Sequence, residues 1–170
     1  PYTTLFRSDG LESHLHRQID RDYFRGFDWF TRERATFSAS PSNLHERVRS
    51  IVSVGLPYYR PMPAIPDDGI LRGRIARYAW GADYHRVLKR RMADLLSRLE
   101  ARAGRPIEAR LLTDTARIVD RAVAARSGLG WYGKHTCIIV PGYGSWVMLG
   151  ELLLDLELEP DAPLDKNCGR

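Results

Sequence analysis

The sequence predicts an α+β fold, a mixed α/β sandwich in which helices pack on a sheet. Three observations support this fold class. Short apolar runs such as Ser50–Leu56 are typical of buried strands. The long amphipathic segment Asp83–Ala103 predicts a helix. The last apolar segments, Thr136–Val140 and Ser145–Leu154, predict two strands joined by a turn, an ending unlike that of a pure doubly wound fold.

The first third of the chain predicts one helix, a loop, a strand and an exposed connection. Leu11–Phe30 has apolar residues at near-helical spacing, so we expect a helix that breaks near Gly26. Arg32–Arg47 is polar and predicts a loop, with a short helix resuming at Leu44. Pro57–Gly69 contains four prolines and follows the Ser50–Leu56 strand as an exposed connection.

The middle of the chain carries the clearest helix signal. Asp83 can cap the predicted helix, and Gly104 with the proline after it ends it. Ile107–Thr113 then predicts a strand, and Arg117–Arg126 predicts a short helix. One face of the long helix carries apolar groups, counting the stem of an arginine: Tyr84, Val87, Leu88, Arg91, Leu95 and Leu99.

Composition limits the classes of protein to which the chain can belong. With 170 residues, 44% of them hydrophobic, the chain can build one core. Two cysteines exclude a disulfide scaffold and fit a reducing cytoplasm. No apolar run reaches the roughly 18–20 residues of a membrane span. A net charge of +5 permits an anionic partner such as RNA.

The two ends of the chain look different from its middle. Pro1–Ser8 resembles the translation of a sequencing-adapter oligonucleotide, so we interpret residues 1–8 as a non-native leader outside the fold. Residues 9–157 form the predicted domain. Residues 158–170 begin with a Pro-rich acidic stretch that is typical of a linker. We therefore expect a segment of a longer protein.

Asp114 is the first candidate for chemistry. It follows an apolar strand, at the kind of strand end where ligands collect in open α/β sheets. A carboxyl group desolvated there could hold a proton near neutral pH and deliver it to a ligand. Asp114 could instead be the N-cap of the helix predicted from Arg117, and its spacing alone favours this role over proton donation.

Three further features have competing interpretations. Gly128–Lys134 contains three glycines that either let the backbone approach a ligand or simply close a helix and form a turn. Glu151 lies in an apolar strand and needs a partner, for which we expect a structural salt bridge. Cys137 is expected to be a buried core thiol. The histidines do not have the spacing of a metal site.

Several short motifs, taken in order, resemble one enzyme family. The motifs are Ala76–Leu88, Thr113–Thr115, Asp120–Ala122, Arg126–Thr136, Tyr143–Trp146, Leu149–Glu151 and Cys168–Gly169. Together they are similar to epoxyqueuosine reductase (QueG), from about Gly10 to the end of the chain. The resemblance implies a nitroreductase-like, cobalamin-binding N-terminal domain that lacks its first helix and strand.

The resemblance also implies a reaction and its cofactors. The family reduces epoxyqueuosine in a tRNA anticodon to queuosine, using cobalamin and two 4Fe–4S clusters, and needs an electron donor. An aspartic acid protonates the leaving oxygen, and Asp114 matches it, so the cap and proton-donor roles can coexist. Cys168 matches the first cluster ligand, and further ligands would lie outside these residues. We therefore expect a cytoplasmic monomer with no membrane segment, and little activity from this chain alone.

The cofactor-binding residues carried over by motif or position lie throughout the chain. They are Arg34, Ala76, Arg77, Asp114, Lys134, Ile138 and Leu149. Around Thr36–Ser40 the chain departs from the family in length, and this bears on the assignment of Arg34. Cobalamin is held in this family without a histidine on cobalt, and the chain has no Asp-x-His-x-x-Gly motif.

Three alternatives to this function remain. A flavin-dependent, nitroreductase-like oxidoreductase would use the same architecture to hold FMN. Reductive dehalogenases resemble the domain, but their expected proton donor is a tyrosine, where this chain has Asp114. A basic RNA-binding module would use Arg86, Lys89 and Arg90, which lie on one face of the long helix.

Overall fold

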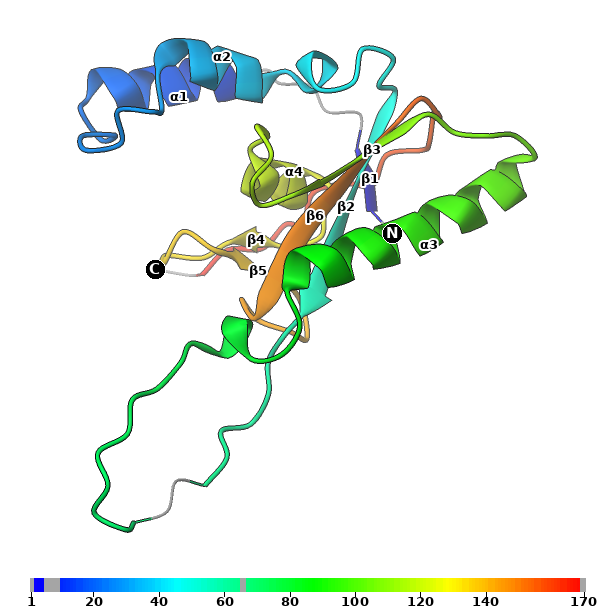
Figure 1. Cartoon of the computed structure of the whole chain (residues 1–170). Coiled ribbons are helices and arrows are strands. Elements are labelled where there is room, and N and C mark those ends of the chain that lie inside the picture. The colour runs from blue at the N-terminus through cyan, green and yellow to red at the C-terminus, as the bar shows by residue number, and fades with distance from the viewer. Residues whose placement is uncertain (1, 5–9, 65–66, 169–170) are drawn as a thin grey trace.

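A four-stranded antiparallel sheet forms the centre of the molecule. The computed structural model describes residues 2–4, 10–64 and 67–168. The strands pair in the order β1-β2-β6-β3, so β6 lies in the interior between β2 and β3 (Figure 1). They are β1 (Tyr2–Thr4), β2 (Ser50–Pro57), β6 (Val147–Leu154) and β3 (Ala109–Thr113). The strands predicted at 50–56, 107–113 and 145–154 are confirmed with small changes at their ends.

Helices cover both faces of this sheet, as the α+β prediction requires. The long helix α3 (Tyr84–Ala103) packs on one face, where Leu88 and Met92 meet Leu152 and Val52. The short helix α4 (Asp120–Arg126) packs on the other face through Val123. Figure 1 shows α3 and α4 on opposite sides of β6. Alternate residues of β6 therefore belong to two different cores.

Helix α3 has the predicted bounds and caps but a different buried face. The Asp83 carboxylate accepts a hydrogen bond from the His85 N–H at 2.9 Å, and Gly104 ends the helix with a φ of 66°. The prediction placed the stem of Arg91 on the apolar face, and this is wrong. Met92 is buried and Arg91 is exposed, because the apolar face follows Leu88 and Met92 down the helix.

The N-terminal region contains two short helices where one helix and a loop were expected. Helix α1 (Leu11–Asp20) ends six residues before Gly26, and turns follow it. The predicted loop over Arg32–Arg47 is partly wrong, since it contains helix α2 (Arg32–Ala39) and the 3-10 turn η1 (Pro41–Asn43). The buried side of α2 consists of small residues, which gave no strong apolar periodicity: Ala35, Ser38 and Ala39.

A second, two-stranded sheet lies beside α4. It pairs β4 (Trp131–Tyr132) with β5 (Ile138–Ile139). The sequence predicted a hairpin between the strand at 136–140 and the strand at 145–154. That pairing is wrong, because β5 pairs with β4 and β6 pairs with β2 and β3. The intervening turn is present, with a bridge between Val140 and Gly144.

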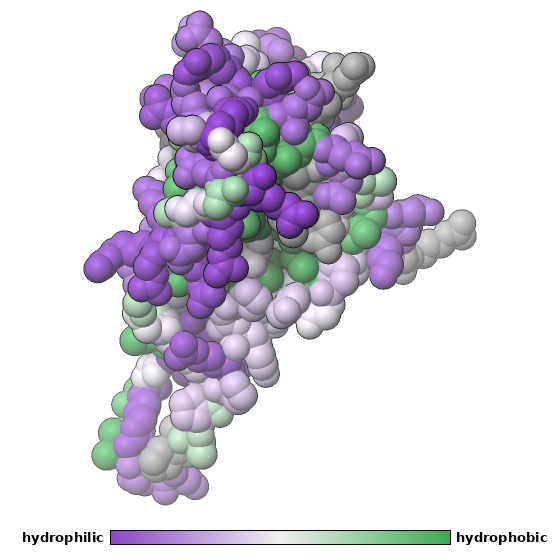
Figure 2. Space-filling view, turned by 90° about the vertical axis from the view of Figure 1, so that its right-hand side faces the viewer, coloured by the Kyte–Doolittle hydropathy of each residue, from purple (hydrophilic) through white to green (hydrophobic). Residues whose placement is uncertain are grey.

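A long segment after β2 projects from the body of the molecule. It confirms the predicted exposed connection and ends in the 3-10 turn η2 (Arg77–Ala79), within the stretch whose type the sequence left open. Figure 2 shows green hydrophobic side chains on this projection, and Ile70, Leu71 and Ile75 are exposed there. Nothing in the described part of the chain forms a helix long and apolar enough to span a membrane.

The predicted leader and linker are only partly described. Residues 2–4 of the leader pair with β2, so this part takes part in the sheet, which differs from the expectation. Residues 1 and 5–8 of the leader, and residues 169 and 170 of the linker, lie outside the described residues. The domain boundaries themselves stay a prediction.

Candidate functional site

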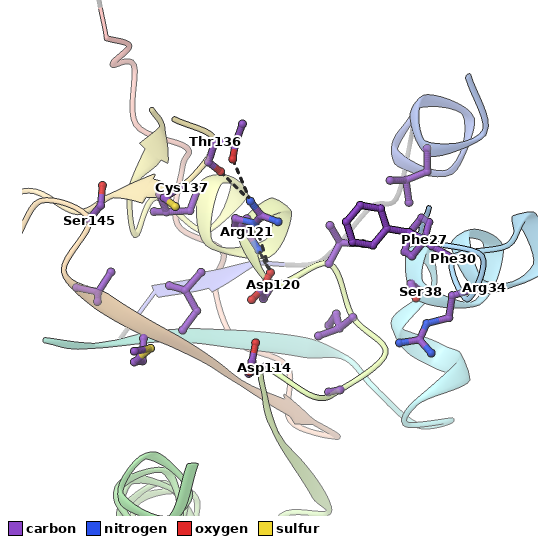
Figure 3. A pocket seen from close by; sticks show the side chains of 18 of the residues that line it. Phe27, Phe30, Arg34, Ser38, Asp114, Asp120, Arg121, Thr136, Cys137 and Ser145 are labelled. Carbon is purple, nitrogen blue, oxygen red and sulfur yellow. Dashed lines mark hydrogen bonds and ion pairs between the residues drawn. The ribbon is translucent and has the colours of Figure 1, made fainter. Parts of the chain in front are cut away.

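A cavity of about 980 Å³ opens on the α4 side of the sheet. That volume is near the upper end of the range of about 300–1,000 Å³ found for small-molecule sites. Its walls come from the α1–α2 region, the loop after β3, the start of α4, and β5 with β6. Figure 3 shows these segments converging, with Phe30 and Arg34 on one side and Cys137 and Ser145 on the other. The pocket is therefore assembled from segments distant in sequence.

One wall of the pocket is aromatic. It comes from the turns that follow α1 and contains Tyr23, Phe24, Phe27, Trp29 and Phe30. Phe24 and Phe30 stack with ring centroids 4.4 Å apart, and the Trp29 ring meets Phe30 edge-on at 5.6 Å. Tyr23, Phe27 and Trp29 remain exposed, which leaves apolar ring faces available to a ligand.

Arg34 projects from the first turns of α2 beside this wall. Helix α2 begins where the Thr31 hydroxyl accepts a hydrogen bond from the Arg34 N–H at 3.1 Å. The Arg34 guanidinium carbon lies 5.4 Å from the centroid of the Trp29 ring, at cation–π distance. The Arg34 Nε is buried and has no hydrogen-bond partner among the described residues. A ligand oxygen in the pocket would satisfy that donor.

Asp114 lines the pocket from the loop immediately after β3. Its Oδ2 accepts a hydrogen bond from the Tyr84 hydroxyl at 2.7 Å and lies 3.5 Å from the His85 Nε2. Burial is the main cause that raises the pKa of Tyr84 to about 12, followed by the hydrogen bond and charge of Asp114. Tyr84 is therefore a hydrogen-bond donor throughout the neutral pH range. The proposed cap role is wrong, because α4 begins six residues later with Val119 as its N-cap. The predicted desolvation of this carboxyl group is also wrong, because the Asp114 side chain is 61% exposed.

The His85 ring bridges two carboxylates at the first turn of α3. Its Nδ1 lies 2.9 Å from the Asp83 Oδ1, and its Nε2 faces Asp114. The Tyr84 and His85 rings stack at a centroid distance of 4.0 Å. Interaction with His85 and the charge of Arg86 hold the pKa of Asp83 below its usual range. Asp83 is thus an anion fixed beside one nitrogen of the ring.

Asp120 is a second acidic group on the pocket wall, at the start of α4. Burial raises its pKa, and the negative charge of Asp114 raises it further, while the neighbouring Arg121 opposes both effects. The Arg121 guanidinium also donates to the Thr136 carbonyl oxygen at 3.0 Å, as the dashed lines in Figure 3 show. This bond ties the start of α4 to the segment before β5.

Glu151 lies beneath this acidic region, fully buried in the middle of β6. The predicted salt bridge is wrong, since neither carboxyl oxygen has a partner among the described residues. Its neighbour across β2 is Ser53, whose hydroxyl is also buried and unpartnered. Burial raises the pKa of Glu151 well above its ordinary value, and the charge of Asp120 adds to that effect. Burial thus favours the neutral acid form of this side chain.

Some of the predicted cofactor-binding residues meet at the pocket and others do not. Arg34, Asp114, Ile138 and Leu149 line it. Ala76, Arg77 and Lys134 are outside the set of lining residues, and both Ala76 and Lys134 are exposed. Arg77 instead packs beside the rings of Tyr59 and Trp146, 5.3 and 5.0 Å from their centroids. Contacts of these three residues with a cofactor stay predictions.

The glycine-rich segment makes its close approaches to the chain itself. A Cβ at Gly130 would lie 2.4 Å from the Ile139 carbonyl oxygen. A Cβ at Gly133 would lie 2.2 Å from the His135 ring. Gly128, with a φ of 70°, follows the end of α4 as the alternative interpretation expected. The pocket is instead lined by the neighbouring stretch through Ser145, Val147, Met148 and Leu149.

The two cysteines have different surroundings from those expected. The expectation of a buried Cys137 is wrong, because this thiol is exposed and lines the pocket. Cys168 is also exposed, and its Sγ lies 3.8 Å from the Tyr132 carbonyl oxygen. Within the described ranges no group of three or more His, Cys, Asp or Glu side chains is arranged so that it could hold a metal ion. The role of Cys168 as a cluster ligand stays a prediction.

Sequence reasoning missed most of the partners of Asp114. Tyr84 and His85, about 30 residues before Asp114, were considered as a metal motif, as part of a helix face and within a family motif, but received no role beside Asp114. Asp120 appeared within a family motif but received no role. The aromatic residues after α1 were interpreted as one face of a continuous helix. The concentration of Tyr, Phe and Trp in residues 23–30 was the signal that could have indicated a ligand-binding wall.

The fold and the pocket define an α+β domain that can hold a large, partly apolar ligand beside a carboxyl group. Comparison with known proteins agrees with this class. Residues 39–115 match the family model described as epoxyqueuosine reductase QueG, DUF1730. An epoxyqueuosine reductase of Xanthomonas campestris is 37% identical over 93% of this chain and 45% of its own length. The chain belongs to the epoxyqueuosine reductase family.

Solved structures are similar over almost the whole chain. Epoxyqueuosine reductase from Streptococcus thermophilus superposes with a TM-score of 0.84 at 33% identity, covering 99% of this chain and 45% of that one. A structure of epoxyqueuosine reductase with an epoxyqueuosine-modified tRNA stem loop has a TM-score of 0.81, at 33% identity, with 98% and 44% coverage. A Bacillus subtilis structure, whose aspartate-bearing catalytic loop is swung out of the active site, has a TM-score of 0.81, at 33% identity, with 99% and 44% coverage. The chain thus spans less than half the length of these relatives.

Proposed function

We propose that this chain forms the cobalamin-binding, proton-donating part of an enzyme that reduces epoxyqueuosine in tRNA to queuosine. The observation that carries the proposal is the position of Asp114, whose carboxyl group lies at the pocket in contact with Tyr84 and near His85. Membership of the epoxyqueuosine reductase family supports the substrate class. The Bacillus subtilis relative, with its aspartate-bearing catalytic loop, supports the choice of residue.

The pocket fits a corrinoid in size and in chemistry. Its volume of about 980 Å³ and its aromatic wall suit a large, flat, partly apolar ring. The unpartnered Nε of Arg34 suits an amide oxygen on the edge of that ring. No histidine is among the lining residues that the structure describes, which suits a cobalt held without a histidine ligand. Cobalamin bound there would supply low-valent cobalt chemistry toward the epoxide.

The chain's own contribution to the reaction is proton delivery in a partly enclosed site. Removing an epoxide oxygen as water consumes two electrons and two protons. Opening the ring places negative charge on the oxygen, and a carboxylic acid within reach cancels that charge as it forms. Asp114 donates this proton, while the Tyr84 hydroxyl fixes one carboxyl oxygen in place. The aromatic residues of the opposite wall exclude water from the place where the epoxide ring opens.

The remaining parts of the proposal concern the partners. The tRNA stem loop bound by a relative supports tRNA as the partner here. Arg86, Lys89 and Arg90 are exposed on α3 and suit a phosphate backbone. Two 4Fe–4S clusters would supply electrons from a donor, and Cys168 would be a ligand of one of them. The chain has two cysteines, so such clusters need thiolates from outside this sequence. The enzyme acts as a cytoplasmic monomer.

The test compares the complete enzyme with its Asp114→Asn variant on epoxyqueuosine-modified tRNA. Asparagine keeps the size of the side chain but cannot donate an acidic proton. We expect the variant to bind cobalamin with an unchanged visible spectrum and to form queuosine about 10²- to 10⁴-fold more slowly. Asp94→Asn, at an exposed site on α3, is the matched control. Undiminished turnover by the Asp114 variant contradicts the proposed role, and a flavin spectrum after reconstitution would favour an FMN enzyme.

A further inference from the structure

His85 occupies an unusual position between two carboxylates. Its Nδ1 lies 2.9 Å from the Asp83 Oδ1, and its Nε2 lies 3.5 Å from the Asp114 Oδ2. The Nε2 atom is buried and makes no hydrogen bond within the described residues, so Asp114 is the group that it faces. The two ring nitrogens thus face two carboxylates: Asp83 at the N-terminus of α3, and Asp114, the proposed acid.

The local structure holds this geometry in place. The Asp83 carboxylate accepts from both the backbone N–H and the ring of His85, so the same group caps α3 and orients the imidazole. The Tyr84 ring stacks on the His85 ring, and its hydroxyl donates to the Asp114 Oδ2. Residues at the first turn of one helix therefore fix both the histidine and the carboxyl group across the pocket edge.

Two protonation states fit the arrangement without rotating any side chain. With the proton on the ring, both ring nitrogens donate, one to Asp83 and the other toward Asp114. With the proton on Asp114, the neutral ring keeps its Nδ1–H for Asp83 and accepts at Nε2. Asp83 selects the tautomer that leaves Nε2 able to accept. The proton can accordingly pass between Nε2 and Oδ2 while every other contact is kept.

Asp114 has a hydrogen-bond donor and a histidine beside it, and its Oδ2 accepts a hydrogen bond from the Tyr84 hydroxyl. Burial is the main cause that raises the pKa of Tyr84 to about 12, so this hydroxyl keeps its proton throughout the neutral range. The Asp114 side chain is 61% exposed, and the titratable ring that faces it is His85, whose Nε2 lies 3.5 Å from the Asp114 Oδ2.

We infer that His85 is the proton reservoir that reloads Asp114, and that Asp83 positions it for this task. The inference rests on the proposed proton-donor role of Asp114. In the reloading step the Nε2–H bond of the imidazolium breaks and an O–H bond forms on the Asp114 carboxylate, which leaves a neutral ring. A proton from bulk solvent must then reach the buried Nε2 to restore the imidazolium. His85 is a positioning and relay residue, since the group that meets the substrate is Asp114.

The charges around His85 set its response to pH. Asp83 and Asp114 face its two nitrogens, Tyr84 stacks on it, Arg86 lies close to Asp83, and Tyr78 is close to Tyr84. Replacing either carboxylate by an amide removes an anion that faces one of the two ring nitrogens.

The first test follows the His85 ring by NMR in the complete enzyme labelled at histidine carbons. Asp83→Asn and Asp114→Asn each remove one charge, and asparagine can still cap α3. We expect each variant to move the midpoint of the His85 signal to lower pH, while the His14 signal on α1 stays unchanged. An unmoved midpoint in the Asp114→Asn protein overturns the inference. This readout does not depend on turnover.

The second test measures queuosine formation as a function of pH. His85→Gln should lower kcat about 10²-fold with little change in KM for the tRNA, and added imidazole should restore part of the rate. Asp83→Asn should move the alkaline fall of kcat to lower pH. His14→Gln, at an exposed site, is the matched control. If Asp114→Asn is inactive but His85→Gln is fully active, the relay is refuted and the proton donor stands. If Asp114→Asn is active, the donor itself is refuted, and the relay with it.

Discussion

Glu151 gives the sharpest prediction about stability. Its carboxyl group is fully buried in β6, and neither oxygen has a partner among the described residues. Burial raises its pKa, so the folded protein keeps a proton that the unfolded chain releases at an ordinary glutamate value of about 4.3. Glu151→Gln replaces the neutral acid with an amide of similar shape that has no proton to lose.

The size and sign of the effect follow from proton linkage. Below the ordinary pKa of glutamate both states hold the proton, and its contribution to stability is fully present. As pH rises toward the raised pKa of the folded state, the unfolded state loses the proton and is stabilised. One proton changes the free energy of unfolding by about 1.4 kcal/mol per pH unit, so the wild-type protein loses that amount per unit across this window. The Glu151→Gln protein lacks this slope and is the more stable of the two at neutral pH.

The assay is urea unfolding of both proteins at a series of pH values between about 5 and 8. Burial raises the pKa of Asp120 and lowers that of His45, so both groups also change stability with pH. Subtracting the free energies of unfolding of the two proteins removes these contributions. Glu46→Gln, at an exposed site, should run parallel to the wild type. Parallel curves for wild type and Glu151→Gln would show that Glu151 is ionised in the fold, and would refute the reasoning.

Two further predictions concern packing and the pocket. Gly130→Ala should lower the free energy of unfolding by about 1–3 kcal/mol in urea, because its Cβ would meet the Ile139 carbonyl oxygen at 2.4 Å. Gly73→Ala should cost little, because its Cβ would meet nothing within 4 Å. Equal costs for the two variants would contradict the close packing at Gly130. Bound cobalamin should slow alkylation of Cys137, which lines the pocket, and leave Cys168 unaffected. Equal rates at Cys137 with and without cobalamin, measured by mass spectrometry, would place the cofactor elsewhere.

The elements that the sequence predicted well are those whose signals are local. Helix α3 could be bounded because a capping aspartate and a terminating glycine flank a long amphipathic stretch. Helix α2 was missed because it buries Ala35, Ser38 and Ala39, small residues that give no apolar stripe. Strands β4 and β5 pair over two residues each, too short for any periodic signal.

The candidate site likewise has a part that the sequence predicted and a part that it did not. Asp114 could be singled out because it follows an apolar strand and matches a family motif. Its contact with Tyr84 and its approach to His85 could not be read from the sequence, because they depend on how α3 lies against β3 in three dimensions. The absence of an ion partner for Glu151 was equally unreadable, since period-2 patterning shows which face a side chain takes and not what it finds there.

Gly150 links the packing of the core to the chemistry at the pocket edge. A Cβ at this position would come within 2.9 Å of the Leu88 Cδ2 and 3.1 Å of the Met92 Sδ. Both neighbours lie on α3, and the same helix begins with Tyr84 and His85. A methyl group added there would crowd two core side chains of the helix whose first turn carries the imidazole, so a residue with no reactive atoms of its own contributes to how that helix is seated.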